Sequence, residues 1–199
     1  MTDKINLSAD VRFGQAMHHT TKQYVMMENE DIFDVFCHKW LKYRDWNLTY
    51  NESEDWNFFN ALGASLLHSF LKSYEEQNLI PVLGENTLYI SDGFLKKSLR
   101  PDFVATRDNK IIIIDFKVGS QWTQEMADTN EQMTEYAIAV KETMLEEPPI
   151  IVAICNMVKK TQIVCWLYSL RTEEQIEQYR EKLHNLHLTE VMGGNICFK

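Results

Sequence analysis

The 199-residue chain lacks the features of membrane, secreted and fibrous proteins. It has no run of 18 or more apolar residues, which a membrane-spanning helix requires. Its first residues, 1–4, are Met-Thr-Asp-Lys, whereas a signal peptide needs an apolar core. Glycine and proline are scarce, at 7 and 4 residues, which excludes collagen-like and low-complexity chains. We therefore expect a globular cytoplasmic protein with no membrane partner.

Paired cysteines and phosphate-binding loops are also missing. The four cysteines are scattered without a Cys-x-x-Cys pair, so we predict reduced thiols and no iron–sulfur cluster. The chain contains no Gly-x-x-x-x-Gly-Lys-Ser/Thr loop, and we expect no nucleotide cofactor. Any helicase activity would belong to a partner subunit.

Basic residues are outnumbered overall, but they are locally concentrated. The net charge of −9 argues against a nucleic-acid partner, because phosphate binding needs Lys and Arg. Residues 93–120, however, carry six bases and three acids, whereas residues 124–147 carry seven acids and one lysine. Within the basic stretch we assign substrate contacts to Lys96, Lys97 and Arg100. A local basic strip is the minimum that nucleic-acid binding requires.

The chain divides into an N-terminal arm, residues 1–55, and a core, residues 56–199, within one domain overall. The arm is polar and acidic, and its apolar spacing predicts one short amphipathic helix over 32–41. In the core, helical spacing predicts helices over 56–77, 123–146 and 172–184. Apolar runs predict strands over 87–91, 99–106, 110–117, 150–155 and 162–167. The order α-β-β-β-α-β-β-α indicates an α/β fold with a mixed central β-sheet flanked by α-helices.

The most informative segment is the predicted strand 110–117, Lys-Ile-Ile-Ile-Ile-Asp-Phe-Lys. Four consecutive isoleucines are typical of a central strand that is buried on both faces. Because side chains alternate along a strand, Asp115 and Lys117 share one face. A tight turn at 107–109 would bring Asp102 of the preceding strand within reach of them.

Buried charges at the end of such a strand are costly unless they are paired or bind an ion. Two carboxylates and a lysine together form a site for a hard cation with an ammonium group beside it. Oxygen ligands suit Mg²⁺ or Mn²⁺, which complete their shells with water and substrate phosphate. The alternative is a plain Asp–Lys ion pair; the Pro101-Asp102 dipeptide at hairpin distance favours the metal site.

Four motifs follow one another between residues 63 and 137. They are a Gly-x-x-x-x-His helix at 63–68, Pro101-Asp102, the Asp-Phe-Lys strand at 115–117, and a Gln-x-x-x-Tyr helix at 132–136. Their order and spacing resemble those of the PD-(D/E)xK nuclease superfamily, in its RecB-like branch. No single motif is specific, but the four in sequence are.

This resemblance implies a restriction-endonuclease-like core and a divalent-metal-dependent deoxyribonuclease. It implies metal ligation by His68, Asp102, Asp115 and the backbone carbonyl of Phe116. Lys117 would serve the attacking water, and Gln132 and Tyr136 would support the site or touch the substrate backbone. The cofactor would be Mg²⁺ or Mn²⁺.

The helix-borne metal ligand has two candidates. His68 lies away from the apolar stripe of its helix, beside small residues that would let a strand approach, and Glu75 shares that side. The choice between them stays open. His18, His19 and His38 lie in polar or amphipathic surroundings, and we interpret them as surface residues.

We expect an exonuclease that acts on DNA ends or single strands, as the RecB-like branch often does. An endonuclease of the same superfamily is the nearest alternative, and RNA remains open as a substrate. A non-catalytic module that binds nucleic acid or protein is the alternative from another class. A partner subunit or a second copy of the chain could supply further basic surface.

Overall fold

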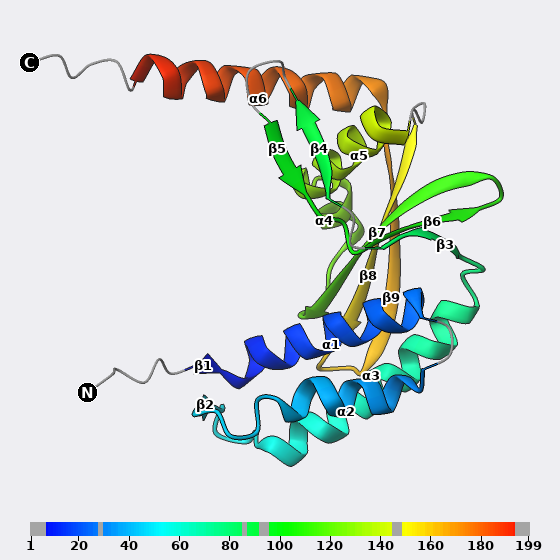
Figure 1. The fold of residues 1–199 in the computed structure, drawn as a ribbon, viewed down its shortest axis with the longest axis vertical. Coiled ribbons are helices and arrows are strands. Elements are labelled where there is room, and N and C mark those ends of the chain that lie inside the picture. The colour runs from blue at the N-terminus through cyan, green and yellow to red at the C-terminus, as the bar shows by residue number, and fades with distance from the viewer. Residues whose placement is uncertain (1–6, 28–29, 85–86, 92–95, 145–148, 194–199) are drawn as a thin grey trace, which may run out of the picture.

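A computed structural model describes residues 7–27, 30–84, 87–91, 96–144 and 149–193, and in it the elements surround a mixed β-sheet (Figure 1). The central five-stranded sheet has the order β3 (Ile80–Leu83), β6 (Phe103–Arg107), β7 (Lys110–Gly119), β8 (Ile150–Val158) and β9 (Ile163–Arg171). Strands β7 and β8 are parallel, and the other neighbours are antiparallel. The predicted α/β fold with a mixed sheet is therefore confirmed.

The hairpin between β6 and β7 has the turn that the sequence predicts. Asp108 and Asn109 occupy its two central positions, with φ angles of 53° and 60°. Tight hairpins require positive φ at both positions, and Asn and Asp tolerate that conformation better than most residues. The turn fixes the register between the two strands, which pairs Phe103 with Ile114.

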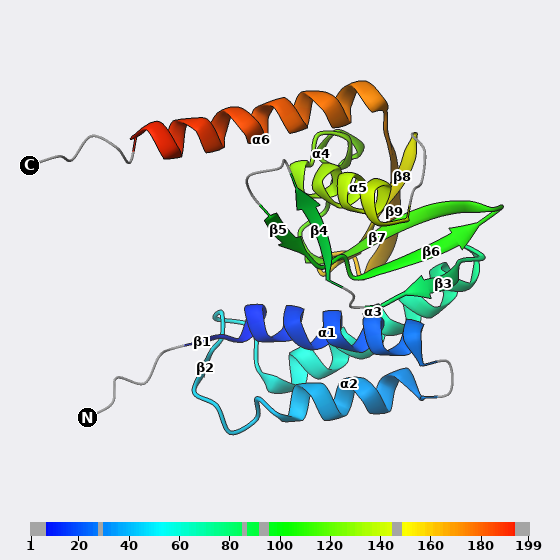
Figure 2. The ribbon, with the colours of Figure 1, turned by 45° about the horizontal axis from the view of Figure 1, so that its top comes forward.

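Three helices lie on one side of the sheet: α1 (Ala9–Met26), α2 (Ile32–Leu41) and α3 (Trp56–Glu75) (Figure 2). Their apolar residues share one buried cluster with Ile112, Ile114 and Phe116 of β7. Helix α3 begins where Asp55 accepts a hydrogen bond from the Phe58 N–H at 2.6 Å, which is a regular N-cap. Near the start of α1, the two-residue strands β1 (Leu7–Ser8) and β2 (Leu48–Thr49) pair in parallel.

The opposite side of the sheet carries α4 (Gln124–Asp128), α5 (Glu131–Met144) and the hairpin of β4 (Leu88–Ser91) and β5 (Lys96–Leu99). Their apolar residues form a second buried cluster with Ile113 of β7 and with β8. The final helix, α6 (Glu173–Gly193), adds Ile176 to this cluster and extends away from the sheet (Figure 1).

Several expected boundaries differ from the structure. The single strand expected over 99–106 is divided between β5 and β6, because Pro101 and Asp102 separate the two. The helix expected over 123–146 is interrupted at Thr129 and Asn130. There Arg171, which is fully buried, donates to the carbonyls of Ala127 and Asn130 at 2.7 and 3.3 Å. These bonds stabilise the end of α4 and separate it from α5.

Four elements had no sequence prediction. Helix α1 and the two-residue strands β1 and β2 lie in the arm, where only the helix over 32–41 was expected, and edge strand β3 follows α3. Helix α1 packs into the same buried cluster as α3 through Phe13 and Met17. No helix in the described part of the chain is both long enough and apolar enough to cross a membrane.

Candidate active site

The end of the β6–β7 hairpin brings two carboxylates together. Strand register pairs Phe103 with Ile114, so Asp102, one residue before β6, lies next to Asp115. Both side chains are buried, with exposed fractions of 4% for Asp102 and 3% for Asp115. Buried carboxylates this close repel each other and need compensating partners.

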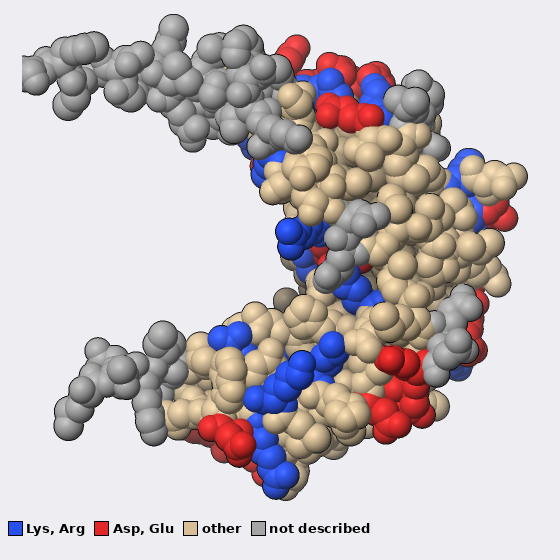
Figure 3. Space-filling model, in the orientation of Figure 1, with Lys and Arg blue, Asp and Glu red and all other residues tan. Residues whose placement is uncertain are grey.

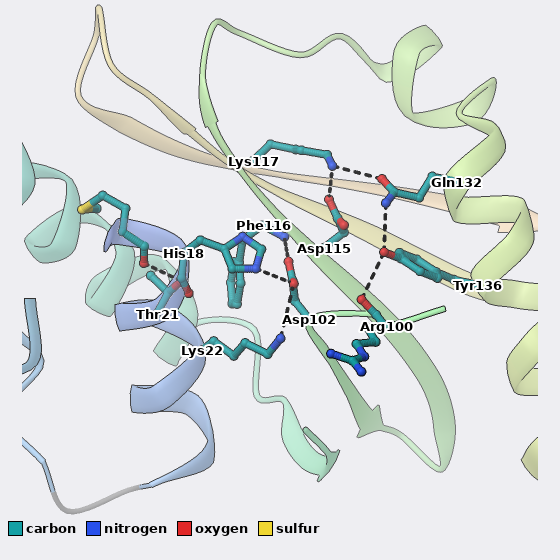
Figure 4. Close-up of polar contacts among 11 residues, drawn as sticks. His18, Thr21, Lys22, Arg100, Asp102, Asp115, Phe116, Lys117, Gln132 and Tyr136 are labelled. Carbon is teal, nitrogen blue, oxygen red and sulfur yellow. Dashed lines mark hydrogen bonds and ion pairs between the residues drawn. The ribbon is translucent and has the colours of Figure 1, made fainter. Parts of the chain in front are cut away.

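Asp102 has partners on both the sheet and α1 (Figure 4). Its Oδ2 accepts a hydrogen bond from the Phe116 N–H at 2.7 Å, which fixes the carboxylate against β7. Its Oδ1 lies 2.6 Å from Nε2 of His18 and 3.7 Å from Nζ of Lys22. Helix α1 therefore covers the carboxylate with a histidine and a nearly buried ammonium group.

Asp115 is less well satisfied than Asp102. Its Oδ2 lies 2.7 Å from Nζ of Lys117, yet this buried oxygen accepts no hydrogen bond of regular geometry. Burial raises the pKa of Asp115 most strongly, and the nearby charge of Asp102 raises it further, while Lys117 opposes both effects. The site thus holds a carboxylate whose charged form still needs stabilisation.

A chain of hydrogen bonds runs from Lys117 to α5 and back to the strands. Nζ of Lys117 donates to Oε1 of Gln132 at 3.1 Å, and Nε2 of Gln132 donates to the hydroxyl of Tyr136 at 2.9 Å. The Tyr136 hydroxyl in turn donates to the Arg100 carbonyl at 3.2 Å. Burial, followed by the charges of Asp115 and Asp102, raises the pKa of Tyr136, so its hydroxyl keeps its proton. This chain fixes the position of the Lys117 ammonium.

The loop after β7 is held by a buried amide. Asn156 of β8 accepts a hydrogen bond from the Trp122 N–H at 2.8 Å and donates to the Ser120 carbonyl at 3.1 Å. The Trp122 ring then lies 5.8 Å from Nζ of Lys117, within the range of a cation–π contact. Asn156 therefore positions a second neighbour of the lysine, a role that sequence reasoning did not assign.

The structure brings most of the predicted site residues to one place. Figure 4 shows two sets of contacts side by side: Phe116 with Asp102, and a chain that runs from Asp115 through Lys117 and Gln132 to Tyr136. Of Phe116, the backbone N–H is the group in contact with Asp102.

The structure places the candidate helix-borne ligands elsewhere. His68 and Glu75 are both exposed on α3, as are Ala61 and Ala64 on the same side. No contact in the described part of the chain joins His68 to either carboxylate, and the histidine that touches Asp102 is His18. Our interpretation of His18 as a surface residue is therefore wrong, because its imidazole bonds to a buried carboxylate.

The predicted substrate-binding residues lie near the site, and two of them have other partners. Lys97 forms an ion pair with Glu135 of α5, and Nε of Arg100 donates to Oγ1 of Thr87 at 3.1 Å. The side chain of Lys96 lies outside the described residues. Lys and Arg side chains gather around the hollow between the N-terminal helices and the rest of the molecule (Figure 3).

The sequence gives no signal that singles out His18. The Gly-x-x-x-x-His spacing occurs twice, at 63–68 and at 14–19, but the second occurrence ends on His19, the neighbour of the histidine that contacts Asp102. Helix α1 is harder to recognise because its buried side includes Thr20 and Thr21. Both hydroxyls donate to backbone carbonyls one turn earlier, at 2.7 and 3.1 Å, so they are satisfied without water.

The donor set fits a divalent cation. The unsatisfied Oδ2 of Asp115 and the raised pKa of that carboxyl both indicate a position where added positive charge would be stabilising. Asp102 and Asp115 supply the carboxylate oxygen ligands that Mg²⁺ and Mn²⁺ prefer. Within the described residues, no three His, Cys, Asp or Glu side chains are arranged to hold a metal ion together. Mg²⁺ commonly takes one or two carboxylates and completes its shell with water and phosphate.

A mixed sheet flanked by helices, with two carboxylates and a lysine at the open end of the β6–β7 hairpin, is typical of a restriction-endonuclease-like fold. The sequence model of the PD-(D/E)XK nuclease superfamily matches residues 3–198, and the chain belongs to that superfamily. The predicted superfamily is therefore confirmed.

A solved structure supports the same fold. A protein of Eubacterium rectale, described as a candidate exonuclease, superposes with a TM-score of 0.54 at 10% identity over 90% of this chain. The chain spans 65% of that protein's length. A second structure, described as SSO0001, matches 98% of this chain and 80% of its own at 12% identity, but its TM-score of 0.34 carries no argument. No curated protein matches the chain.

Proposed function

We propose that this chain is a divalent-metal-dependent nuclease that hydrolyses phosphodiester bonds of DNA, acting as a RecB-like exonuclease on ends or single strands. The observation that carries the proposal is the pair of buried carboxylates, Asp102 and Asp115, with the half-buried Lys117 beside them at the end of one hairpin. Such a group costs folding free energy, because two carboxylates leave water. A requirement for cation and phosphate binding explains why the group is there.

The bound metal ion would be held by Asp102 and Asp115, with His18 bonded to Asp102 from α1, and would supply Lewis-acid stabilisation of the phosphate and a more acidic water. The side chains and backbone of the protein position the attacking water and the carboxylates. The ammonium group of Lys117 is held by its hydrogen bond to Gln132. From that position it would donate a hydrogen bond to the attacking water and orient it. Tyr136 keeps its proton and holds Gln132, and the Phe116 N–H holds Asp102.

An endonuclease of the same superfamily is the alternative within this class. The two differ in whether the substrate strand must present an end, and the carboxylate–lysine group serves either reaction. A binding module without catalysis is favoured only by the net charge of −9. The unsatisfied Oδ2 of Asp115 argues against it, because binding alone gives no reason to keep that buried charge.

Cleavage of end-labelled single-stranded DNA, duplex DNA and RNA tests this proposal. Wild type and Asp115→Ala are compared in EDTA, Mg²⁺ and Mn²⁺. We expect metal-dependent cleavage of DNA by the wild type and none by the variant, with products shortened progressively from an end. Internal fragments at early times would instead indicate the endonuclease. Folded wild type that binds neither metal nor DNA would contradict the nuclease proposal.

A further inference from the structure

The two carboxylates of the candidate active site are compensated to different degrees. Asp102 contacts three groups, which are the Phe116 N–H, Nε2 of His18 and Nζ of Lys22. Among the described residues, Asp115 pairs with Lys117 alone, and its buried Oδ2 accepts no hydrogen bond of regular geometry. Asp115 therefore needs an added cation more than Asp102 does.

Lys22 is an unusual lysine because it is nearly buried. The residue is 8% exposed, and its ammonium group lies 3.7 Å from Oδ1 of Asp102. Lysines are almost never buried without a partner, because the charge loses its hydration. Figure 4 shows that Lys22 and His18, one helical turn apart on α1, both point toward Asp102. Helix α1 thus places a positive charge beside this carboxylate.

The packing of α1 keeps this charge in place. Phe13, Met17 and Val25 of α1 are at most 2% exposed, and they belong to the apolar cluster that α1 shares with β7. Moving the helix away from the sheet would open that cluster and expose its apolar side chains to water. The ammonium group of Lys22 is therefore a built-in part of the site.

The charges of the site favour one added divalent cation over two. The two aspartates face two ammonium groups, those of Lys22 and Lys117, so these four side chains together carry no net charge. In the described part of the chain, no third acidic side chain joins the aspartates in a metal-binding group. A two-metal site holds its cations about 3.5–4 Å apart, and a phosphodiester offsets only one of their positive charges. One divalent cation leaves a much smaller excess of positive charge than two.

We propose that the site binds one divalent cation, and that Lys22 supplies the positive charge that a second cation would bring, by neutralising Asp102. Lys22 is then a positioning residue that acts through Asp102 and leaves the unsatisfied oxygen of Asp115 as the main attraction for the metal ion. The inference rests on the proposed nuclease function. It adds the number of metal ions and names the side chain that sets this number.

Calorimetric titration of the full chain with Mn²⁺, without nucleic acid, tests the proposal. We expect the wild type to bind one Mn²⁺ per chain. Lys22→Met removes the charge and keeps a side chain of similar length, and we expect it to lower the Kd for Mn²⁺ by about tenfold, because the ammonium group repels a bound cation. Lys22→Arg should keep the wild-type Kd. The matched control is Lys72→Met, which removes the charge of an exposed lysine in the last turn of α3 and should leave the Kd unchanged.

The direction of the change separates this role from a merely structural one, because loss of a structural residue would loosen the site and weaken Mn²⁺ binding. Circular dichroism checks that the variants are folded, and Lys22→Gln gives the same comparison where Lys22→Met does not fold. Two Mn²⁺ ions per wild-type chain, or an unchanged or higher Kd in a folded Lys22→Met or Lys22→Gln, overturns the inference while metal-dependent cleavage upholds the nuclease. A wild type that neither binds Mn²⁺ nor cuts nucleic acid overturns both.

Discussion

The two faces of strand β7 differ in chemistry: one is apolar, and the other carries charged side chains. On the side of α1 and α3, Ile112, Ile114 and Phe116 are buried in one continuous apolar cluster. On the side of α5, the side chains of the same strand change from apolar to charged within four residues, from Ile113 to Asp115 and Lys117. The apolar face raises the free energy of unfolding. The charged face lowers it, because its carboxylates are buried. Substitutions on the two faces should therefore affect different measurements.

The largest expected effect is on the charged face. Asp115→Asn should reduce the rate of metal-dependent DNA cleavage by at least about 10³-fold, because loss of an outer-shell partner alone costs about 10- to 100-fold in metal affinity or activity. Far-ultraviolet circular dichroism should stay the same as in the wild type. Rates from single-turnover assays at equal protein concentration test this, and a variant with near-normal rates would contradict a catalytic role for the charged face.

The apolar face should show the reverse behaviour. Ile114→Ala removes a fully buried side chain, and we expect it to lower the free energy of unfolding by about 2–5 kcal/mol. Urea denaturation measures that loss. Cleavage per folded molecule should remain within about twofold of the wild type, since Ile114 touches the apolar cluster and not the carboxylates. A large loss of cleavage rate in a fully folded sample would show that the apolar face also contributes to catalysis.

Helix α1 extends the comparison to the two candidate histidines. His18→Ala removes the imidazole that lies 2.6 Å from Asp102, and we expect cleavage to fall by about 10- to 100-fold. His68→Ala is the matched control, because His68 is exposed on α3 and should leave the rate unchanged. Parallel kinetic assays of the two variants decide between them. A loss of cleavage rate in His68→Ala alone would instead support His68 as the metal ligand, as the sequence predicts.

The smallest expected effect concerns stability against pH in EDTA. Burial raises the pKa of Asp115, so the folded chain holds that proton more tightly than the unfolded chain does. The resulting stabilisation is present below the unfolded value of about 3.9 and is lost as the pH rises through the raised pKa. Asp115→Asn, which stays neutral, should therefore have a higher Tm than the wild type at neutral pH and a similar Tm near pH 4. A lower Tm at neutral pH would mean that Lys117 outweighs burial.

The sequence predicts the core of this site well because its signals are local. The isoleucine run, the Asp-Asn turn and the Asp-x-Lys spacing lie within one hairpin, where strand alternation alone determines which side chains meet. Gln132 and Tyr136 are four residues apart on a helix, so their proximity is also local.

The contribution of α1 could not be predicted in the same way. His18 meets Asp102 only through packing between segments 84 residues apart in the chain, since 102 − 18 = 84. The buried threonines of α1 also weaken the apolar periodicity that identifies a helix. The break between α4 and α5 depends on Arg171, which comes from the last strand of the sheet.

The most direct test of the account is Mn²⁺ binding by calorimetry, without nucleic acid, to wild type and to Asp115→Asn. On the charged face of β7, the buried Oδ2 of Asp115 has no hydrogen-bond partner, so a bound cation would stabilise it. We expect the wild type to bind Mn²⁺ and to gain thermal stability from it, and the variant to do neither. Equal binding by both proteins would contradict the assignment of Asp115 as a metal ligand.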